Sequence, residues 1–224
     1  MAHIPLLGHQ HVDRSRTMIN DLITSYYHTI PEPQPQIIPL LSSTKFQHIA
    51  LIKQCIIDPA LITALVERWR LETHTFHLPY YRCTITLKDA LESMVVTGPS
   101  FLHWDELCDE LLGQVPLDNA RKGAALKLTW LLRILCTPFP EEPTIHQLQC
   151  KSRAYIIYMI DNALIPDKSG NRVHLMYLNH LHDFDNIKKY SWGFACLVNL
   201  YRELCRASSE VGRVMDGSAI QLQS

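Results

Sequence analysis

Residues 153–207 read RAYIIYMIDNALIPDKSGNRVHLMYLNHLHDFDNIKKYSWGFACLVNLYRELCRA. This stretch predicts one apolar helix, a tight polar turn and two further helices. Its run from Ala154 to Ile160 is apolar on every side, which is typical of a helix buried all round. Thr144 is the expected N-cap, and Pro166 the expected end, because the residue before a proline avoids the α region. The rest of the chain is therefore expected to pack on this central helix.

The segments that follow the central helix carry their own signals. Gly170 and Asn171 tolerate positive φ and so favour a turn. Beyond Ser191, apolar side chains recur at three-four spacing, which predicts an amphipathic helix docked on a core. These side chains are Phe194, Leu197, Val198, Tyr201, Leu204 and Cys205.

Composition bounds the class of protein. The chain has 224 residues, of which 47% are hydrophobic, so it can bury the core of one domain. A formal charge of -1 and a pI near 6.9 give no support for binding to polyanions or to charged membranes. No apolar run approaches the roughly 18 residues of a membrane span, and the N-terminus lacks the features of a secretory signal. A soluble intracellular protein is expected.

The cysteines and histidines do not form a recognisable metal motif. Seven cysteines occur singly, without a CxxC pair, and are predicted to be reduced and mostly buried. Of the 12 histidines, two groups invite a zinc site, but neither has partners at zinc-finger spacing, and HEXXH is absent. The cysteines are Cys55, Cys83, Cys108, Cys136, Cys150, Cys196 and Cys205; the histidine groups are His74 with His77, and His174 with His180 and His182. We expect no metal.

The first part of the chain is expected to lack regular structure. Residues 1–43 contain prolines interleaved with glutamines, which favour an extended or polyproline linker. The residues concerned are Pro31, Pro33, Gln34, Pro35, Gln36 and Pro39.

Helical signals begin near Lys45, where Phe46 and Ile49 start a three-four pattern. Asp58 followed by Pro59 is a favoured start for a second helix. The buried face of this helix is expected to comprise Leu61, Ile62, Leu65, Val66 and Trp69.

One short β-hairpin is expected after that helix, from Thr75–Leu78 and Cys83–Ile85, because β-branched and aromatic residues flank a proline-containing turn. Thr86 and Asp89 resemble a capping pair for the next helix. The predicted fold is therefore mainly α, a single helical domain with one short β-hairpin.

Two more helices are predicted before the central one. The first covers 104–113 and ends at Gly113 as C-cap, and the second runs from about Ala124 to Leu135. Four tryptophans are each expected on the apolar face of a helix, as packing anchors rather than ligand platforms. They are Trp69, Trp104, Trp130 and Trp192.

Several of these segments, in this order, resemble the plant mobile domain family. They are ALVERWRLETHTFHLP (64–79), WDELCDELLG (104–113), LTWL (128–131), RAYIIYM (153–159), IPDKSGNRVHLMYL (165–178), YSWG (190–193) and LYRELCRA (200–207). Members of that family often carry names such as aminotransferase-like or serine/threonine-protein phosphatase 7 long form homologue. The resemblance covers residues 44–213 and leaves 214–224 as a tail.

The resemblance implies a set of motif positions, which we expect to be structural. They are Trp69, Arg70, Phe76, Leu78, Pro79, Trp104, Trp130, Arg153, Ala154, Tyr155, Pro166, Asp167, Lys168, Ser169, Gly170, Tyr190, Trp192, Gly193 and Tyr201.

The chain also departs from the family pattern. Tyr81 and Arg82 stand where relatives usually have Gly-Glu, and Leu91–Gly98 replaces a longer segment. Asp161 and Asn162 replace Gly-Gly, so a buried carboxylate and amide must find partners or loosen the packing. The relatives continue into a further helical region beyond the present C-terminus, so a truncated member is expected.

The resemblance implies a non-enzymatic nuclear interaction module in plant development, meristem maintenance and the silencing of transposons or genes. The expected partner is a phosphatase-7-like protein or another mobile-domain chain. Two alternatives are a nucleic-acid-associated role in a mobile element and a non-functional truncated copy. The candidate basic face is Lys168, Arg172, Lys188, Lys189, Arg202 and Arg206, but Asp167, Asp183, Asp185 and Glu203 lie among them. Nucleic-acid affinity is therefore expected to be weak.

Enzymatic function is not expected, despite the family names. The phosphatase signatures GDxHG, GDxxDRG and GNHE are missing from the sequence, as are a P-loop and a GxSxG elbow. A glycine- or serine-rich cup for pyridoxal phosphate is also not visible. No residue is assigned a catalytic, cofactor-binding or metal-binding role, and no cofactor is expected.

Overall fold

The central helix is the organising element of the structure, a computed structural model that describes residues 30–44, 46–50, 58–86, 93–98, 103–117, 119–165 and 171–209. This helix, α7, spans Ile145–Met159 and continues into one π-helical segment, η2, Ile160–Leu164. Thr144 caps it as predicted, in a capping box in which Thr144 and Gln147 each bond the other's backbone N–H. Every residue from Cys150 to Ala163 is buried, which confirms a helix enclosed on all sides.

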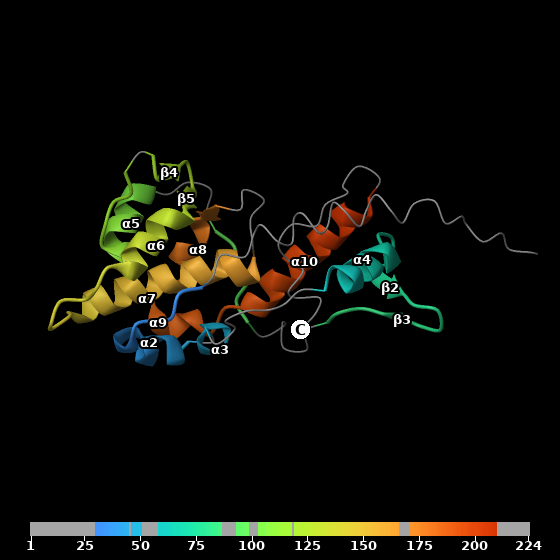
Figure 1. Ribbon diagram of the computed structural model, residues 1–224, viewed down its shortest axis with the longest axis horizontal. Coiled ribbons are helices and arrows are strands. Elements are labelled where there is room, and N and C mark those ends of the chain that lie inside the picture. Colours follow the sequence, from blue (N-terminus) through green and yellow to red (C-terminus); the bar gives the residue numbers. More distant parts are fainter. Residues whose placement is uncertain are drawn as a thin grey trace, which may run out of the picture.

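Short helices surround α7 to form a large lobe (Figure 1). They are η1 (Pro35–Ile37), α2 (Ile38–Ser42), α3 (Gln47–Ala50), α5 (Trp104–Leu112), α6 (Leu128–Cys136), α8 (Met176–Asn179) and α9 (Phe184–Ile187). Their apolar side chains form one continuous core with those of α7. The expected Gly113 C-cap is present, with Gly113 at φ 70°.

A three-stranded antiparallel sheet in the large lobe was not predicted. Its strands are β4 (Arg121–Lys122), β5 (Ala125–Lys127) and β6 (Arg172–His174), in that order. Leu126 pairs with Val173, and both are fully buried. Because β6 recruits residues 125–127 into the sheet, α6 begins at Leu128 rather than near Ala124.

A small lobe holds the second sheet. It consists of α4 (Pro59–Arg68), β1 (Trp69–Arg70), β2 (Thr75–His77) and β3 (Arg82–Cys83). Asp58 caps α4 as predicted, accepting bonds from the backbone N–H groups of Ala60 and Leu61. The single predicted hairpin is thus one part of a three-stranded sheet, in which Trp69 pairs with Phe76 and Phe76 with Cys83. The fold is mainly α, with two small sheets instead of one hairpin among the described residues.

The helix α10, Trp192–Ser208, joins the two lobes (Figure 1). Its first residue, Trp192, packs in the large core. Leu200 and Leu204 pack in a separate cluster with residues of α4, β1 and β2. Two helices were predicted after the turn. The described residues there form three, α8, α9 and α10, because Met176–Asn179 and Phe184–Ile187 each form one short turn of helix.

The expectation of an extended linker up to residue 43 is wrong for residues 35–42. These form η1 and α2, and they bury Ile37 and Leu41 in the large core. Pro35 is the first residue of η1 and Pro39 the second of α2, and in the first turn of a helix a missing N–H costs no hydrogen bond. Burial of two apolar side chains thus overrides the local preference of a proline-rich sequence.

Several other expectations are changed or lie beyond the described structure. Trp69 is in β1 rather than in a helix, and Leu61 is exposed rather than on the buried face of α4. The other members of that face are buried or half-buried. Outside the described residues lie the proposed cap residue Asp89, the turn 166–170, Cys55 and the tail 214–224.

We predict that Leu204→Ala lowers the free energy of unfolding by about 2–5 kcal/mol, because it leaves a cavity where α10 meets the small lobe. Leu204 is 0% exposed, whereas Val198, on the same helix, is 51% exposed. Val198→Ala is the matched control and is expected to change stability by less than about 0.5 kcal/mol. Urea denaturation of both variants measures the difference, and equal effects would contradict the packing of α10 described above.

Candidate functional site

The motif residues of the small lobe form an aromatic cluster. The ring centroid of Trp69 lies 4.9 Å from that of Phe76 and 5.1 Å from that of Tyr201. The indole N–H of Trp69 donates to Cys205 Sγ at 3.4 Å. Residues more than a hundred positions apart in the sequence are thereby held in one packing centre, as expected of structural motif positions.

Hydrogen bonds fix the position of Tyr201 in this cluster. Its hydroxyl donates to the carbonyl of Ile85 at 2.6 Å and lies 2.7 Å from Thr84 Oγ1. His74 stacks on the Tyr201 ring, with centroids 5.9 Å apart, and has a positive φ of 48°. A left-handed backbone is uncommon for a residue with a side chain, so the cluster holds His74 in a costly conformation.

The remaining motif residues of the small lobe lie nearer the surface. Arg70 is exposed, Leu78 is half-buried, and Pro79 is in the turn between β2 and β3. The Leu78 N–H donates to the Tyr81 carbonyl at 3.0 Å, which closes this turn. The side chains of Tyr80 and Tyr81 at its tip are 95% and 63% exposed.

The motif residues of the large lobe are also engaged in packing. The indole N–H of Trp192 donates to the Ile187 carbonyl at 3.0 Å, and its ring lies 5.2 Å from that of Phe46. The Tyr155 hydroxyl donates to the Pro31 carbonyl at 2.8 Å, and burial raises the pKa of Tyr155 to about 12. Of the others, Trp130 and Ala154 are buried, Trp104 and Tyr190 are half-buried and Gly193 is exposed, while Pro166, Asp167, Lys168, Ser169 and Gly170 lie outside the described residues.

Arg153 is a buried guanidinium that ties α7 to the segment before α9. Its Nε donates to the Leu181 carbonyl at 2.8 Å and its Nη2 to the His182 carbonyl at 2.9 Å. The guanidinium also lies over the Phe184 ring at 5.1 Å. Burial lowers the pKa of Arg153, although Cys150 and Glu110 partly oppose that shift. Arg153 therefore binds backbone carbonyls of its own chain.

Two cavities flank the first half of α7. The cavity beside Arg153 has a volume of about 660 Å³ and lies between α2, α5, α7 and α9. Across it, His182 Nε2 lies 3.0 Å from Glu110 Oε1. The other, which we name the Lys151 pocket, has a volume of about 360 Å³ and is lined by the ends of α5 and α6, residues 137–140 and the start of α7.

Cys150 and His146 line the Lys151 pocket as neighbours on one helical face, with Sγ 3.4 Å from Nε2. Burial raises the pKa of the Cys150 thiol, although the neighbouring Arg153 partly opposes this. A thiol with a raised pKa remains protonated at neutral pH and is a poor nucleophile. The pair has the spacing of a Cys–His dyad without an activated thiolate.

The other described cysteines lie in the core or at the surface. The six within the described ranges are free: Cys108 and Cys150 are buried, Cys196 and Cys205 are intermediate, and Cys83 and Cys136 are exposed. Burial raises the pKa of both Cys108 and Cys196 to about 12. The prediction of mostly buried cysteines is thus wrong for Cys83 and Cys136.

The three histidines considered for a zinc site do not converge on one point. His174 Nδ1 accepts from the Met176 N–H at 3.1 Å, His180 Nδ1 lies 3.1 Å from the Met176 carbonyl, and His182 faces Glu110. Across the residues that the structure describes, no group of three or more His, Cys, Asp or Glu side chains is arranged to hold a metal ion. No helix in this part of the chain is long and apolar enough to cross a membrane.

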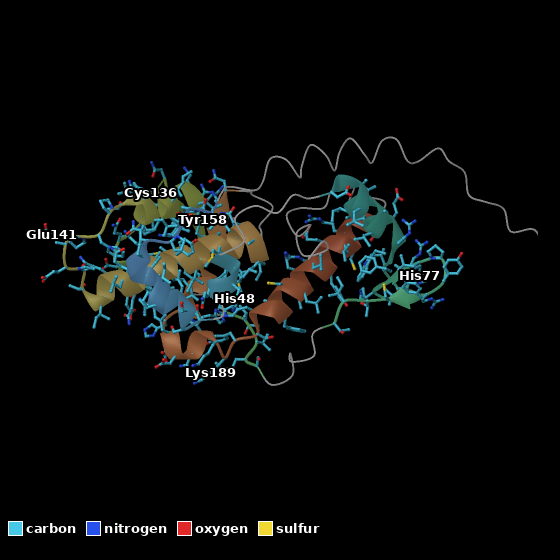
Figure 2. The ribbon with its side chains drawn as sticks, turned by 60° about the horizontal axis from the view of Figure 1, so that its bottom comes forward. His48, His77, Cys136, Glu141, Tyr158 and Lys189 are labelled. Atoms are coloured by element: carbon cyan, nitrogen blue, oxygen red, sulfur yellow. The ribbon has the colours of Figure 1, made fainter. Side chains whose placement is uncertain are left out.

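The candidate basic residues do not share one face. Arg202 and Arg206 both contact the buried carboxylate of Glu203 on α10. Lys189 follows α9 at one edge of the large lobe (Figure 2), whereas Arg172 is in β6, which pairs with β5. Lys168 lies outside the described residues.

Asp161 and Asn162, at which the chain departs from the family pattern, lie in the π-helical segment η2. Both side chains are buried. The Ile165 N–H donates to the Ile160 carbonyl at 2.7 Å, as the wider helix requires. Asp161 interacts with neighbouring groups, so it is not an unpaired buried charge. The amide nitrogen and oxygen of Asn162, in contrast, are buried without a hydrogen-bond partner among the described residues.

Sequence reasoning did not single out Lys151, His146 or Glu110 as site residues. A signal for Lys151 exists, since it lies four residues before Tyr155 and thus on the same face of a helix expected to be buried. Glu110 and His182 are 72 positions apart, so their contact has no local signature.

The fold and these contacts define a mainly helical, two-lobed protein whose motif side chains serve as packing centres. The chain belongs to the plant mobile domain family, whose model matches residues 45–224. No solved structure matches it.

Curated relatives from Arabidopsis thaliana carry several names. The chain is 42% identical over 174 residues to a serine/threonine-protein phosphatase 7 long form homolog, covering 75% of this chain and 13% of that protein. It is 32% identical to Protein MAIN-LIKE 2, covering 85% and 29%, and 30% identical to Protein MAINTENANCE OF MERISTEMS, covering 83% and 40%. The chain thus spans less than half the length of each of these relatives.

We predict that Arg153→Lys lowers the free energy of unfolding by about 1–3 kcal/mol, because a compact ammonium cannot reproduce the fork that reaches both carbonyls. Arg70→Lys, at an exposed motif position, is the matched control and is expected to be neutral. Guanidinium denaturation measures both variants. A neutral Arg153→Lys would refute the role of Arg153 as a backbone clamp.

Proposed function

We propose that this chain is a non-enzymatic interaction module that acts in the nucleus, in plant development, meristem maintenance and the silencing of transposons or genes. Membership of the plant mobile domain family supports the proposal. The name of one relative, MAINTENANCE OF MERISTEMS, supports the developmental setting. The proposed partner is a phosphatase-7-like protein or another mobile-domain chain.

The observation that carries the proposal is how the motif side chains are used. Trp69, Arg153, Tyr155 and Tyr201 all direct their polar atoms to groups within the chain. Protein binding therefore has to use other side chains, and the β2–β3 turn offers Tyr80 and Tyr81, both exposed.

Exposed tyrosines suit a protein interface because each supplies a large apolar surface and a polar tip. Tyr81 stands where relatives usually have glycine, so this contact surface is a feature of the present chain. We propose that Tyr80 and Tyr81 form part of the partner surface.

Nucleic-acid binding is the weaker alternative. A strand binder needs a basic groove and aromatic platforms. The near-neutral charge of the chain, and the pairing of Arg202 and Arg206 with Glu203, favour at most weak, non-specific binding that is lost at physiological salt.

The test is a binding titration of the purified chain with a phosphatase-7-like protein and with a second mobile-domain protein. We expect one of them to bind, and the double variant Tyr80→Ser, Tyr81→Ser to weaken binding at least about tenfold, equivalent to about 1.4 kcal/mol. Val115→Ser with Leu117→Ser is the matched control, because those side chains are also exposed, at 50% and 64%, in a different loop.

A parallel DNA titration at low and physiological salt separates the two functions. Tight, sequence-selective DNA binding that persists at physiological salt, with neither protein bound, would overturn the proposed function in favour of the mobile-element alternative.

A further inference from the structure

Lys151 is a buried ammonium group whose described neighbours are all neutral. Its side chain is on the central helix, and the residue is only 7% exposed. Its Nζ donates to the Thr137 carbonyl and, at 3.2 Å, to Gln34 Oε1, and it lies 3.9 Å from the centre of the Phe139 ring. These contacts give two of its three N–H groups an oxygen acceptor but supply no negative charge.

A buried charge without a counterion is costly, because dipoles replace only part of the lost hydration. Burial accordingly lowers the pKa of Lys151. None of the described residues that line the adjoining pocket is acidic. The pocket thus has a positive charge at one end, and no acidic residue in its described lining balances that charge.

One wall of the pocket is suited to an apolar group, while Gln114, Thr137, His146 and Gln147 form its polar part. Leu112, Ile134, Pro138, Phe139 and Pro140 line the apolar wall, and Cys150 is a protonated thiol. Its volume of about 360 Å³ lies within the roughly 300–1,000 Å³ range of small-ligand sites. The pocket therefore combines an apolar wall with one buried cation.

We propose that the Lys151 pocket binds a carboxylate carried on a small apolar or aromatic body. The carboxylate replaces the neutral Gln34 amide oxygen on Lys151 Nζ, and the apolar body packs against Phe139 and the neighbouring prolines. The exchange adds the attraction between two opposite charges, which is stronger at a site shielded from water than in bulk solvent. A single ammonium suits a monoanionic carboxylate better than a phosphate, which proteins hold with several N–H donors.

The experiment uses the full chain, labelled with ¹⁵N, and two matched pairs of probes. Phenylacetate is compared with phenylacetamide, and acetyl-Phe-Glu-amide with acetyl-Phe-Gln-amide. We expect at least one acid to bind saturably, with shifts in the amide signals of residues 112–114, Thr137 and Phe139, and its amide to bind at least about tenfold more weakly. If phenylacetate binds more tightly, the source is a free small acid, and if the peptide does, it is an acidic segment of a protein.

Variants then locate the charge. Lys151→Met is expected to abolish the preference for acid over amide, and Lys151→Arg to retain part of it. Lys122→Met, at an exposed lysine on β4, is the matched control and is expected to leave the preference unchanged. The comparison of acid with amide needs no variant, so it stands if Lys151→Met fails to fold.

The proposal is overturned if neither acid binds saturably at millimolar concentration, if acid and amide bind equally, or if Lys151→Met keeps the preference. This inference does not depend on the partner surface at Tyr80 and Tyr81, so either proposal can fail without the other.

Discussion

Complete burial of the central helix is the constraint on which the large lobe depends. The helix α7 has no exposed face from Cys150 onward, yet it carries the polar side chains of Lys151, Ser152 and Arg153 there. Each of them must find an acceptor inside the protein, because an unpaired buried donor costs about 1–3 kcal/mol. Ser152 bonds within the helix to the Leu148 carbonyl, while the two cations reach carbonyls of neighbouring segments.

These bonds decide what surrounds the helix. Arg153 fixes the chain before α9, Lys151 fixes the end of α6, and Tyr155 fixes the approach of the N-terminal segment at Pro31. That segment lies before residue 45, where the family match begins, yet it places Ile37 and Leu41 in the core. The folded unit in this chain thus extends beyond the matched residues.

Most motif residues within the described ranges are buried or half-buried. Trp69, Phe76 and Tyr201 hold the small lobe, and Arg153 and Trp192 hold the large one, with α10 shared between them. Binding specificity is then expected from side chains outside the motifs, and both proposals made above rest on such side chains. Neither Tyr81 nor Lys151 is a motif position: the sequence pattern pointed to Tyr81 only as a departure from the family, and it did not point to Lys151.

The sequence by itself determined the features that depend on a few neighbouring residues. The caps at Asp58 and Thr144, the left-handed end at Gly113 and the all-round burial of α7 follow from short-range backbone sterics and apolar periodicity. The ordered motifs were also enough for the family. These signals lie within one or two helical turns, so no knowledge of the rest of the chain is needed to interpret them.

Only the tertiary structure decided the features that depend on distant partners. Residues 125–127 are strand because β6 pairs with them, and Pro35–Ser42 is helical because the core accepts Ile37 and Leu41. The Lys151 pocket likewise exists because the ends of α5 and α6 meet the start of α7. Strand pairing and the burial of a charge depend on which distant segments come into contact. A local sequence pattern does not contain that information.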